Sequence, residues 1–443
     1  MRIVQITPSA GDSFYCENCL RDIGLVRAMR KLGHDVIMVP LYLPLPAQKG
    51  EAISSAPIFF GGINVYLQQK SSLFRKTPRW IDRLFDSPRL LGWVARKAGM
   101  TSANDLGRTT ISMLQGEHGR QIKELDRLVD WLGGENNKAD VICLSNVLLV
   151  GLARRVKEKL GVPIVCFLQD EHGFLDGLAR PYSDQAWEIL AQRSQDVDAF
   201  VAVSRFYADF MRQRLELDAG RMRVGYMGIS LEGYGPRQRE PETPTIGFLS
   251  QMCSDKGLDT LVDAFVMLKK KGELKNARLR VAGGHSASDK AFLQGIRDKL
   301  ARRCWGGLVS CGLAGDVEFL TDFDRAAKLD FLRSLSVLSV PEKRPAAYGL
   351  YVLEALAAGV PVVQPNHGVF PELYQMTGGG VLFEPNNAAE LARAIERLLL
   401  DPDHARQLGQ NGQKAVFEKF NIEQTARQIL RIYEEVLQNF PRG

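Results

Sequence analysis

The stretch 339–373 carries the strongest chemical signal in the sequence. An apolar strand is expected over 335–340, and after a turn-rich loop Gly349 and Leu350 open a helix that carries Glu354. In a parallel sheet, ligands bind beyond the carboxyl ends of the strands, where the next helix presents unpaired N–H groups and the positive end of its dipole. This pattern predicts that the helix start at Gly349 cradles a phosphate.

The same stretch resembles the signature of the family-4 retaining glycosyltransferases of GT-B architecture, which reads Glu-x-Phe-Gly-Leu-x-x-x-Glu-Ala. The residues that carry the resemblance are Tyr348-Gly349-Leu350, Leu353-Glu354-Ala355, Ala358-Gly359-Val360-Pro361-Val362-Val363 and Pro371-Glu372-Leu373. Tyr348 stands where phenylalanine is usual. It belongs to the expected donor site and is expected to pack rather than to react.

Of the two glutamates in the signature, this sequence keeps the second and replaces the first by alanine. The resemblance implies that Glu354, the second of them, binds the ribose or the sugar of a nucleotide sugar. Ala346 occupies the position of the first, which in the family contacts hydroxyl groups of the donor sugar. Three explanations stay open: Glu342 substitutes from the same loop, the donor differs, or the protein has lost transfer activity.

A second resemblance lies in the stretch 246–258, which is similar to the family's strand, loop and helix that grip the diphosphate with an arginine and a lysine. Lys256 matches the lysine and directly precedes a helix start, where a cation and helix amides can act on one anion. Gln251 stands at the arginine position, and glutamine donates a hydrogen bond but neutralises no charge. Lys256 and Glu354 are the expected catalytic residues.

The first half of the chain offers looser candidates for substrate binding. Gly11 and Asp12 follow the first strand, where the resembled family has a small-residue loop over the phosphates. Asp170, Glu171 and His172 follow a later strand. Three titratable groups are more than a turn requires, so we expect this segment to face the substrate.

The order of apolar segments predicts the architecture. Strands are expected over 2–7, 35–40, 141–144, 164–168 and 199–203, and the alternation with helices restarts at 245–249 and 278–282. A polar run rich in Pro and Gly over 233–244 separates the halves. We therefore expect an α/β protein of the GT-B class, with two Rossmann-like doubly wound domains facing across a cleft. The expected domains are 1–236, on the acceptor side, and 237–421, which binds the nucleotide sugar, with the helix of 422–443 packing back on the first.

Composition narrows the class of protein. At 443 residues, with 45% apolar and 24% charged residues, the chain suits two globular domains. Stretches apolar enough for a membrane span are missing, so a cytoplasmic protein is expected. Seven cysteines suit reduced thiols, and Cys16 and Cys19 are interpreted as packing residues, with a metal or redox role as the alternative.

A basic and aromatic segment covers 70–99, with eight Lys or Arg residues against Asp82 and Asp86 and with interleaved Phe and Trp. Such a segment suits an anionic lipid surface or a phosphorylated acceptor, and the alternative is an amphipathic helix pair that packs on its own domain. Peripheral contact at the inner membrane face is therefore an open alternative. Nucleic acid is not an expected partner, because nothing else in the chain continues the basic patch.

The resemblance implies transfer of a glycosyl group, with retention, from a nucleotide-diphosphate sugar to a hydroxyl of a glycan, lipid or small-molecule acceptor. The departing diphosphate would be held by Lys256 and the amides at Gly349 and Leu350, and would itself take the acceptor proton. Neither a metal nor a further cofactor is expected. The alternative is a catalytically weakened or silent GT-B protein that binds a nucleotide or a partner, which Ala346 and Gln251 favour.

Overall fold

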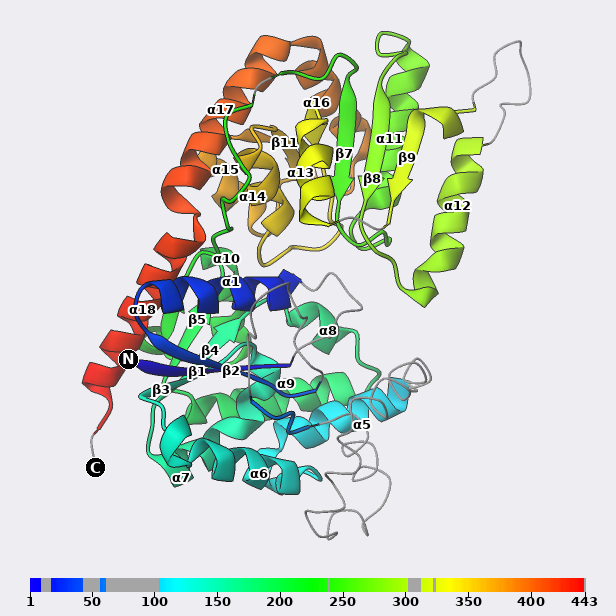
Figure 1. Ribbon diagram of the computed structural model, residues 1–443. Helices are drawn as coiled ribbons and strands as arrows, with labels where there is room; N and C mark the ends of the chain where they lie inside the picture. The colour runs from blue at the N-terminus through cyan, green and yellow to red at the C-terminus, as the bar shows by residue number, and fades with distance from the viewer. Residues whose placement is uncertain are drawn as a thin grey trace. The chain divides into compact units, whose positions relative to one another are not determined.

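The computed structural model describes residues 1–8, 17–42, 56–60, 103–237, 239–301, 312–321 and 324–441 (Figure 1). Two compact units make up the chain. Unit 1 contains Met1–Tyr226 and Thr425–Gly443, and unit 2 contains Met227–Gln424. Each unit is built on a six-stranded parallel sheet, which confirms the α/β fold class.

Unit 1 has the strand order β2-β1-β3-β4-β5-β6. Its strands are β1 (Arg2–Thr7), β2 (Asp35–Pro40), β3 (Val141–Leu144), β4 (Ile164–Leu168), β5 (Ala199–Ala202) and β6 (Met222–Val224). Its helices of five or more residues are α1 (Glu17–Lys31), α5 (Ala103–Leu114), α6 (Ile122–Leu132), α7 (Ala153–Leu160), α8 (His172–Asp176), α9 (Tyr182–Arg193), α10 (Arg205–Arg214) and α18 (Ile422–Asn439), with the 3-10 helix η6 (Val147–Leu152). The central strands are buried along their whole length because helices cover both faces of the sheet.

The last helix of the chain, α18, packs on unit 1. Thr425 donates its hydroxyl to the carbonyl of Tyr226 (3.0 Å), and the amide of Gln428 donates to the carbonyl of Val224 (2.9 Å). Ile429 and Tyr433 are fully buried. In Figure 1, α1 and α18 lie on one side of this sheet, and α6, α7 and α9 lie on the other.

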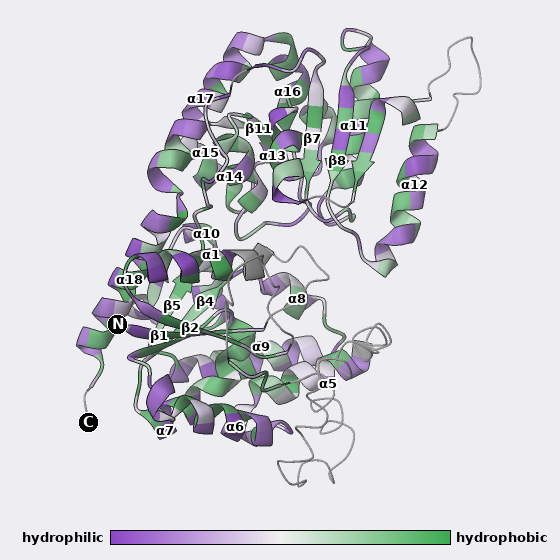
Figure 2. Ribbon diagram, viewed as in Figure 1, coloured by the Kyte–Doolittle hydropathy of each residue, from purple (hydrophilic) through white to green (hydrophobic). Residues whose placement is uncertain are grey.

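Unit 2 has the strand order β12-β11-β10-β7-β8-β9. Its strands are β7 (Thr245–Leu249), β8 (Arg278–Ala282), β9 (Val317–Leu320), β10 (Val337–Leu338), β11 (Val362–Pro365) and β12 (Gly380–Phe383). Its helices are α11 (Leu258–Lys271), α12 (Lys290–Ala301), α13 (Arg325–Arg333), α14 (Leu350–Ala357), α15 (Phe370–Thr377), α16 (Ala388–Leu400) and α17 (Pro402–Lys419). In Figure 2 the inner strands are mostly hydrophobic, whereas the outer helices show both colours, as expected for amphipathic helices over a buried sheet.

The segment that follows Tyr226 belongs to unit 2 through its backbone. The N–H of Ile229 donates to the carbonyl of Phe420 (2.8 Å), and the guanidinium of Arg325 donates to the carbonyl of Glu232 (2.6 Å). Unit 2 therefore begins before the polar run of 233–244, from which we placed the boundary at 236/237. Composition reports which residues suit an exposed connection, whereas backbone hydrogen bonds decide which unit holds it.

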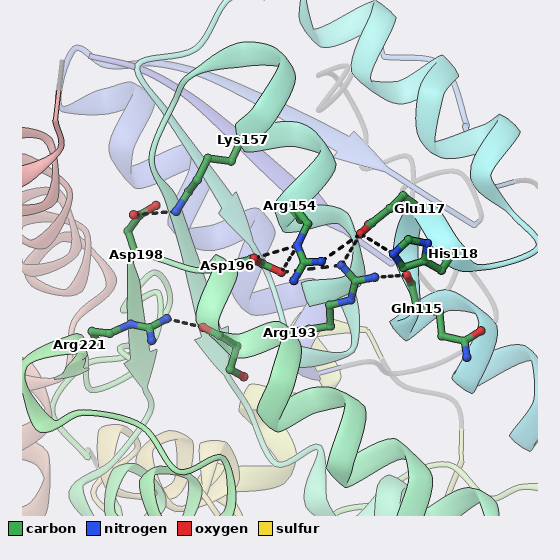
Figure 3. Close-up of polar contacts among 10 residues, drawn as sticks. Gln115, Glu117, His118, Arg154, Lys157, Arg193, Asp196, Asp198 and Arg221 are labelled. Atoms are coloured by element: carbon green, nitrogen blue, oxygen red, sulfur yellow. Dashed lines mark hydrogen bonds and ion pairs between the residues drawn. The ribbon is translucent and has the colours of Figure 1, made fainter. Parts of the chain in front are cut away.

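A partly buried ionic network ties elements of unit 1 together (Figure 3). Arg193, at the end of α9, donates to the carboxylate of Glu117 (2.7 Å) and to the carbonyl of Gln115. Arg154 of α7 binds Asp196 (3.1 Å) and approaches Glu117 at 3.5 Å. Burial raises the pKa of Glu117, but the hydrogen bond from Arg193, a backbone hydrogen bond and the charges of both arginines outweigh burial, so the pKa lies below its ordinary value.

We expect Arg193→Ala to lower the free energy of unfolding by about 1.5–3 kcal/mol at neutral pH, because it removes the charge-assisted hydrogen bond to the partly buried Glu117, which keeps only the longer contact with Arg154. The depressed pKa of Glu117 stabilises the fold above the unfolded value of 4.5 and ceases to do so as the pH falls through the folded value. The effect of the substitution should therefore shrink below pH 4.5. Urea unfolding at pH 7 and pH 3.5 tests this.

A suitable control is Asp184→Asn, which removes the exposed pair between Asp184 in the first turn of α9 and Arg180, just before that helix. Its expected effect is below about 0.5 kcal/mol. Equal losses in the two variants would show that the network contributes no more than a surface pair.

Candidate functional site

Two loops meet at the carboxyl end of the sheet in unit 2. The loop after β7 reaches α11 through Gly257, whose φ is +72° and whose missing Cβ would lie 1.9 Å from the carbonyl oxygen of Pro341, in the loop after β10. The N–H of Lys343 donates to the carbonyl of Asp255 (2.9 Å). Only glycine allows this approach at position 257, since any side chain would collide with backbone.

The contact between the loops brings Lys256 to Glu342. The amine of Lys256 lies 2.9 Å from Oε2 of Glu342, and the hydroxyl of Tyr351 donates to Oε1 at 2.7 Å. Glu342 is only 6% exposed. Tyr351 lies in the first turn of α14, so one carboxylate links the expected diphosphate lysine to the helix start expected to hold phosphate. We call these three residues the Lys256 cluster.

Glu354 lies on the same helix, α14, but is paired elsewhere. Its Oε1 accepts a hydrogen bond from Nζ of Lys328 on α13 at 2.5 Å, and both residues are more than nine-tenths buried. Burial, followed by the negative charge of Glu354, raises the pKa of Tyr234 well above its ordinary value. The partner Lys328 was missed from the sequence, because nothing in the pattern of α13 distinguishes it from a surface lysine.

The helix start at Gly349 has the expected form. Leu350 is the first residue of α14, and Gly349 caps the helix without a side-chain hydrogen bond. Tyr348 is half-buried beside it. An anion placed there would meet backbone N–H groups that no capping side chain occupies.

Ala346 is packed closely against Gly368 and Val369, in the loop after β11. It is 3% exposed, and its carbonyl accepts a hydrogen bond from the N–H of Val369 at 3.0 Å. Gly368, with φ of +60°, presses against it so closely that an added Cβ would lie 2.6 Å from the Ala346 nitrogen. The position that carries a glutamate in the resembled family is therefore packed against the loop after β11.

Gln251 is engaged with a neighbouring loop. Its amide donates to Asp289 at 3.1 Å, and Asp289 also accepts from the N–H of Ser286 at 2.8 Å. Burial raises the pKa of Asp289, but the hydrogen bonds from Ser286 and Gln251 and the charge of His285 outweigh it and lower the pKa. Gln251 thus holds the segment that leads into α12.

The described candidates of unit 1 are one buried carboxylate, that of Glu171, and two partly buried side chains, those of Asp170 and His172. Glu171 is 6% exposed and accepts hydrogen bonds from the N–H groups of Gln169 (2.6 Å) and Val147 (3.0 Å) and from the hydroxyl of Tyr207 (2.9 Å). Burial raises its pKa despite these bonds. Our expectation that Glu171 faces the substrate therefore needs correction, because its carboxylate binds the ends of neighbouring elements.

Asp170 and His172 lie just after β4, and their side chains are partly buried, with 34% of the Asp170 side chain and 15% of the His172 side chain exposed. Asp170 has φ of +76°, which is uncommon for a residue other than glycine, and its carboxylate lies 3.5 Å from Nδ1 of His172. The imidazole packs edge-on against Phe210 with a ring separation of 5.0 Å. Gly11, Asp12, Cys16 and the segment 70–99 lie outside the described residues.

Comparison with known proteins identifies the families that the two halves of the chain match and the fold that they share. Residues 236–415 match the family described as glycosyl transferases group 1, and residues 112–232 match Glycosyltransferase Family 4. Solved structures share the fold over nearly the whole chain. Sucrose-phosphate synthase from Thermosynechococcus elongatus aligns with a TM-score of 0.69 at 17% identity, covering 99% of each chain, and HepE from Anabaena in complex with UDP aligns with 0.67 at 15%, covering 98% of this chain and 100% of that one. The fold is thus the two-domain GT-B fold.

Curated relatives agree with the family matches. A GDP-mannose-dependent alpha-(1-6)-phosphatidylinositol monomannoside mannosyltransferase of Mycobacterium tuberculosis is 30% identical over 200 residues, which are 44% of this chain and 48% of that protein. A D-inositol 3-phosphate glycosyltransferase of Gordonia bronchialis is 25% identical over 256 residues, 55% of this chain and 54% of that protein. The chain spans about half the length of these relatives. It belongs to the family-4, group 1 glycosyltransferases.

The helices of the described ranges were also compared with the length and hydropathy of a membrane span. None of them is both long enough and apolar enough to cross a bilayer.

We expect Lys328→Met to lower the free energy of unfolding of unit 2 by about 3 kcal/mol, because it removes the ammonium that compensates the buried charge of Glu354. The double variant Lys328→Met with Glu354→Leu should regain most of the loss, since an apolar pair can replace a buried ion pair. Denaturant unfolding of the three proteins provides the measurement. If the double variant is as unstable as the single one, the two side chains do not act as a pair.

Proposed function

We propose that this protein transfers a glycosyl group, with retention, from a nucleotide-diphosphate sugar to a hydroxyl of an acceptor. The observation that carries the proposal is the Lys256 cluster, which joins a lysine before α11 to the first turn of α14 at the carboxyl end of one parallel sheet. A cation and a helix start in this position suit a diphosphate group.

The names of the related proteins support a nucleotide sugar as the donor. The mycobacterial relative is described as GDP-mannose-dependent, and HepE has been crystallised with UDP and with UDP-glucose. The names of the relatives also favour a hydroxyl-rich acceptor, because one acts on a phosphatidylinositol monomannoside and another on D-inositol 3-phosphate. We therefore propose an acceptor of glycan, lipid or polyol type.

In the proposed mechanism the diphosphate leaves through an oxocarbenium-like transition state. Negative charge grows on the leaving oxygens, and Lys256 and the N–H groups at Gly349 and Leu350 stabilise this charge. The leaving phosphate takes the proton of the acceptor hydroxyl, and no metal takes part. Glu354, held by Lys328, offers carboxylate oxygens to hydroxyl groups of the ribose or the sugar.

We expect Lys256→Met to reduce kcat/KM for the donor by about 10- to 150-fold, which corresponds to about 1.5–3 kcal/mol for a lost hydrogen bond to a charged group. Assays with UDP-glucose and GDP-mannose, scored for transfer and for donor hydrolysis, provide the measurement.

The matched control is Lys271→Met. This substitution removes a lysine from the other end of α11, where Lys271 is paired with Glu396 at 2.6 Å. It should leave kcat/KM unchanged. Equal activity of the Lys256 variant and the wild type would exclude Lys256 from the donor site.

A nucleotide-binding protein without transferase activity is the second candidate, favoured by two observations. The amide of Gln251 donates a hydrogen bond to Asp289. Ala346 is packed against Gly368 and has no carboxylate to offer a ligand. Both contacts reduce the groups available to a donor sugar.

For this second candidate we expect UDP or GDP to bind as tightly as the corresponding nucleotide sugar, because the remaining anchors address phosphate and ribose. Calorimetry with UDP and UDP-glucose, and with GDP and GDP-mannose, measures the difference. A preference of tenfold or more for the sugar-bearing ligand, about 1.4 kcal/mol, would show that some residue binds the sugar. It would contradict the hypothesis of a nucleotide-binding protein without transferase activity.

A further inference from the structure

We propose that Glu342 is an internal counter-ion of Lys256, which the diphosphate of the donor has to displace or repel, so that Glu342 sets the affinity for the donor. The inference deepens the proposed function and rests on it, since it concerns the same diphosphate site. In the sequence, Glu342 was only a candidate substitute for the missing glutamate at Ala346. Its contacts assign it a different role.

The position of Glu342 is determined by four contacts. Its two carboxylate oxygens meet Lys256 at 2.9 Å and Tyr351 at 2.7 Å, and its backbone carbonyl lies 3.0 Å from Nε2 of His367. Its N–H donates to the carbonyl of Val340 at 2.8 Å. The carboxylate is therefore held beside Lys256 from the main chain and from the side chain, and Tyr351 prevents it from turning away without the loss of a buried hydrogen bond.

Charge makes this arrangement unfavourable for a diphosphate. An oxygen bound to Nζ of Lys256 at about 2.8 Å would lie roughly 5 Å from the carboxylate of Glu342. Lysine has three donor hydrogens and can contact both groups at once, but the two anions repel each other at that distance. Glu342 therefore cancels much of the attraction that Lys256 contributes.

Two neighbouring side chains, those of Gln251 and Lys343, do not add free positive charge beside Lys256. Gln251 supplies no charge, and the amine of Lys343, the residue after Glu342 in the loop after β10, lies 2.6 Å from Asp259 and donates to Ser254 at 2.8 Å. Each of the two loop lysines is thus matched by a carboxylate in the protein.

Three possible roles of Glu342 predict different changes in the affinity for a nucleoside diphosphate when Glu342 is replaced by glutamine. If Glu342 is a counter-ion, Glu342→Gln removes the competing charge and tightens the binding of a nucleoside diphosphate. If it orients Lys256, the same substitution weakens that binding. If it reads the sugar, binding of the diphosphate stays unchanged and only the nucleotide sugar binds less tightly.

The experiment is calorimetry of the full chain with UDP, GDP, UDP-glucose and GDP-mannose. Glutamine keeps the shape of Glu342 and an oxygen that accepts from Tyr351. We expect Glu342→Gln to bind the preferred nucleoside diphosphate at least about tenfold more tightly than the wild type, with a similar gain for its nucleotide sugar. Tyr351→Phe, which lets the carboxylate turn away, should give a smaller gain of the same sign.

Glu396→Gln is the matched control. It removes the carboxylate of another Lys–Glu pair, with Lys271, about 20 Å away at the far end of α11, and should leave all four affinities unchanged. Thermal unfolding of each variant checks that the fold is kept.

Weaker or unchanged diphosphate binding in a folded Glu342→Gln protein overturns the counter-ion role of Glu342. It does not affect the proposed transferase function. Failure of the wild type and of Glu342→Gln to bind any of the four ligands overturns the proposed donor site, and the counter-ion with it.

Discussion

The geometry of the Lys256 cluster depends on the absence of one side chain, that of Gly257. Its left-handed backbone lets the loop after β7 pass 1.9 Å from the Pro341 oxygen, measured to the position of the missing Cβ. That approach places Lys256 beside Glu342 and directs the chain into α11. Any larger residue would separate the two loops and with them the lysine, the carboxylate and the first turn of α14. A steric constraint in the backbone thus decides an electrostatic arrangement.

Three buried carboxylates of the described residues are compensated by donors of the protein itself. Burial of a charge is unfavourable unless hydrogen bonds or an opposite charge replace the lost water. The pairings are Glu171 with Tyr207, Glu342 with Lys256 and Tyr351, and Glu354 with Lys328. Such groups can serve the fold and the chemistry together, since a ligand that enters must exchange with contacts that already stabilise the chain.

Family membership and the details of the site carry different information. The GT-B fold is shared with proteins of 15% and 17% identity, so the fold alone does not specify a substrate. The departures at Ala346 and Gln251 distinguish this chain from the resembled signature. The structure shows that both positions are occupied by internal contacts, with Gly368 and with Asp289. They are integrated features of the loops rather than gaps in an otherwise unchanged site.

The sequence by itself determined most strands and the start of α14, because runs of apolar residues bounded by Gly, Pro and polar turns report local structure. The strand expected over 335–340 shortened to Val337–Leu338, since pairing partners rather than apolar character define a strand's ends. Tertiary structure alone decided the partners of the charged residues. Lys256 and Glu342 are 86 positions apart, and Lys328 and Glu354 are 26 apart. No local pattern encodes such pairs, because they form only where the sheet brings separate loops and helices together.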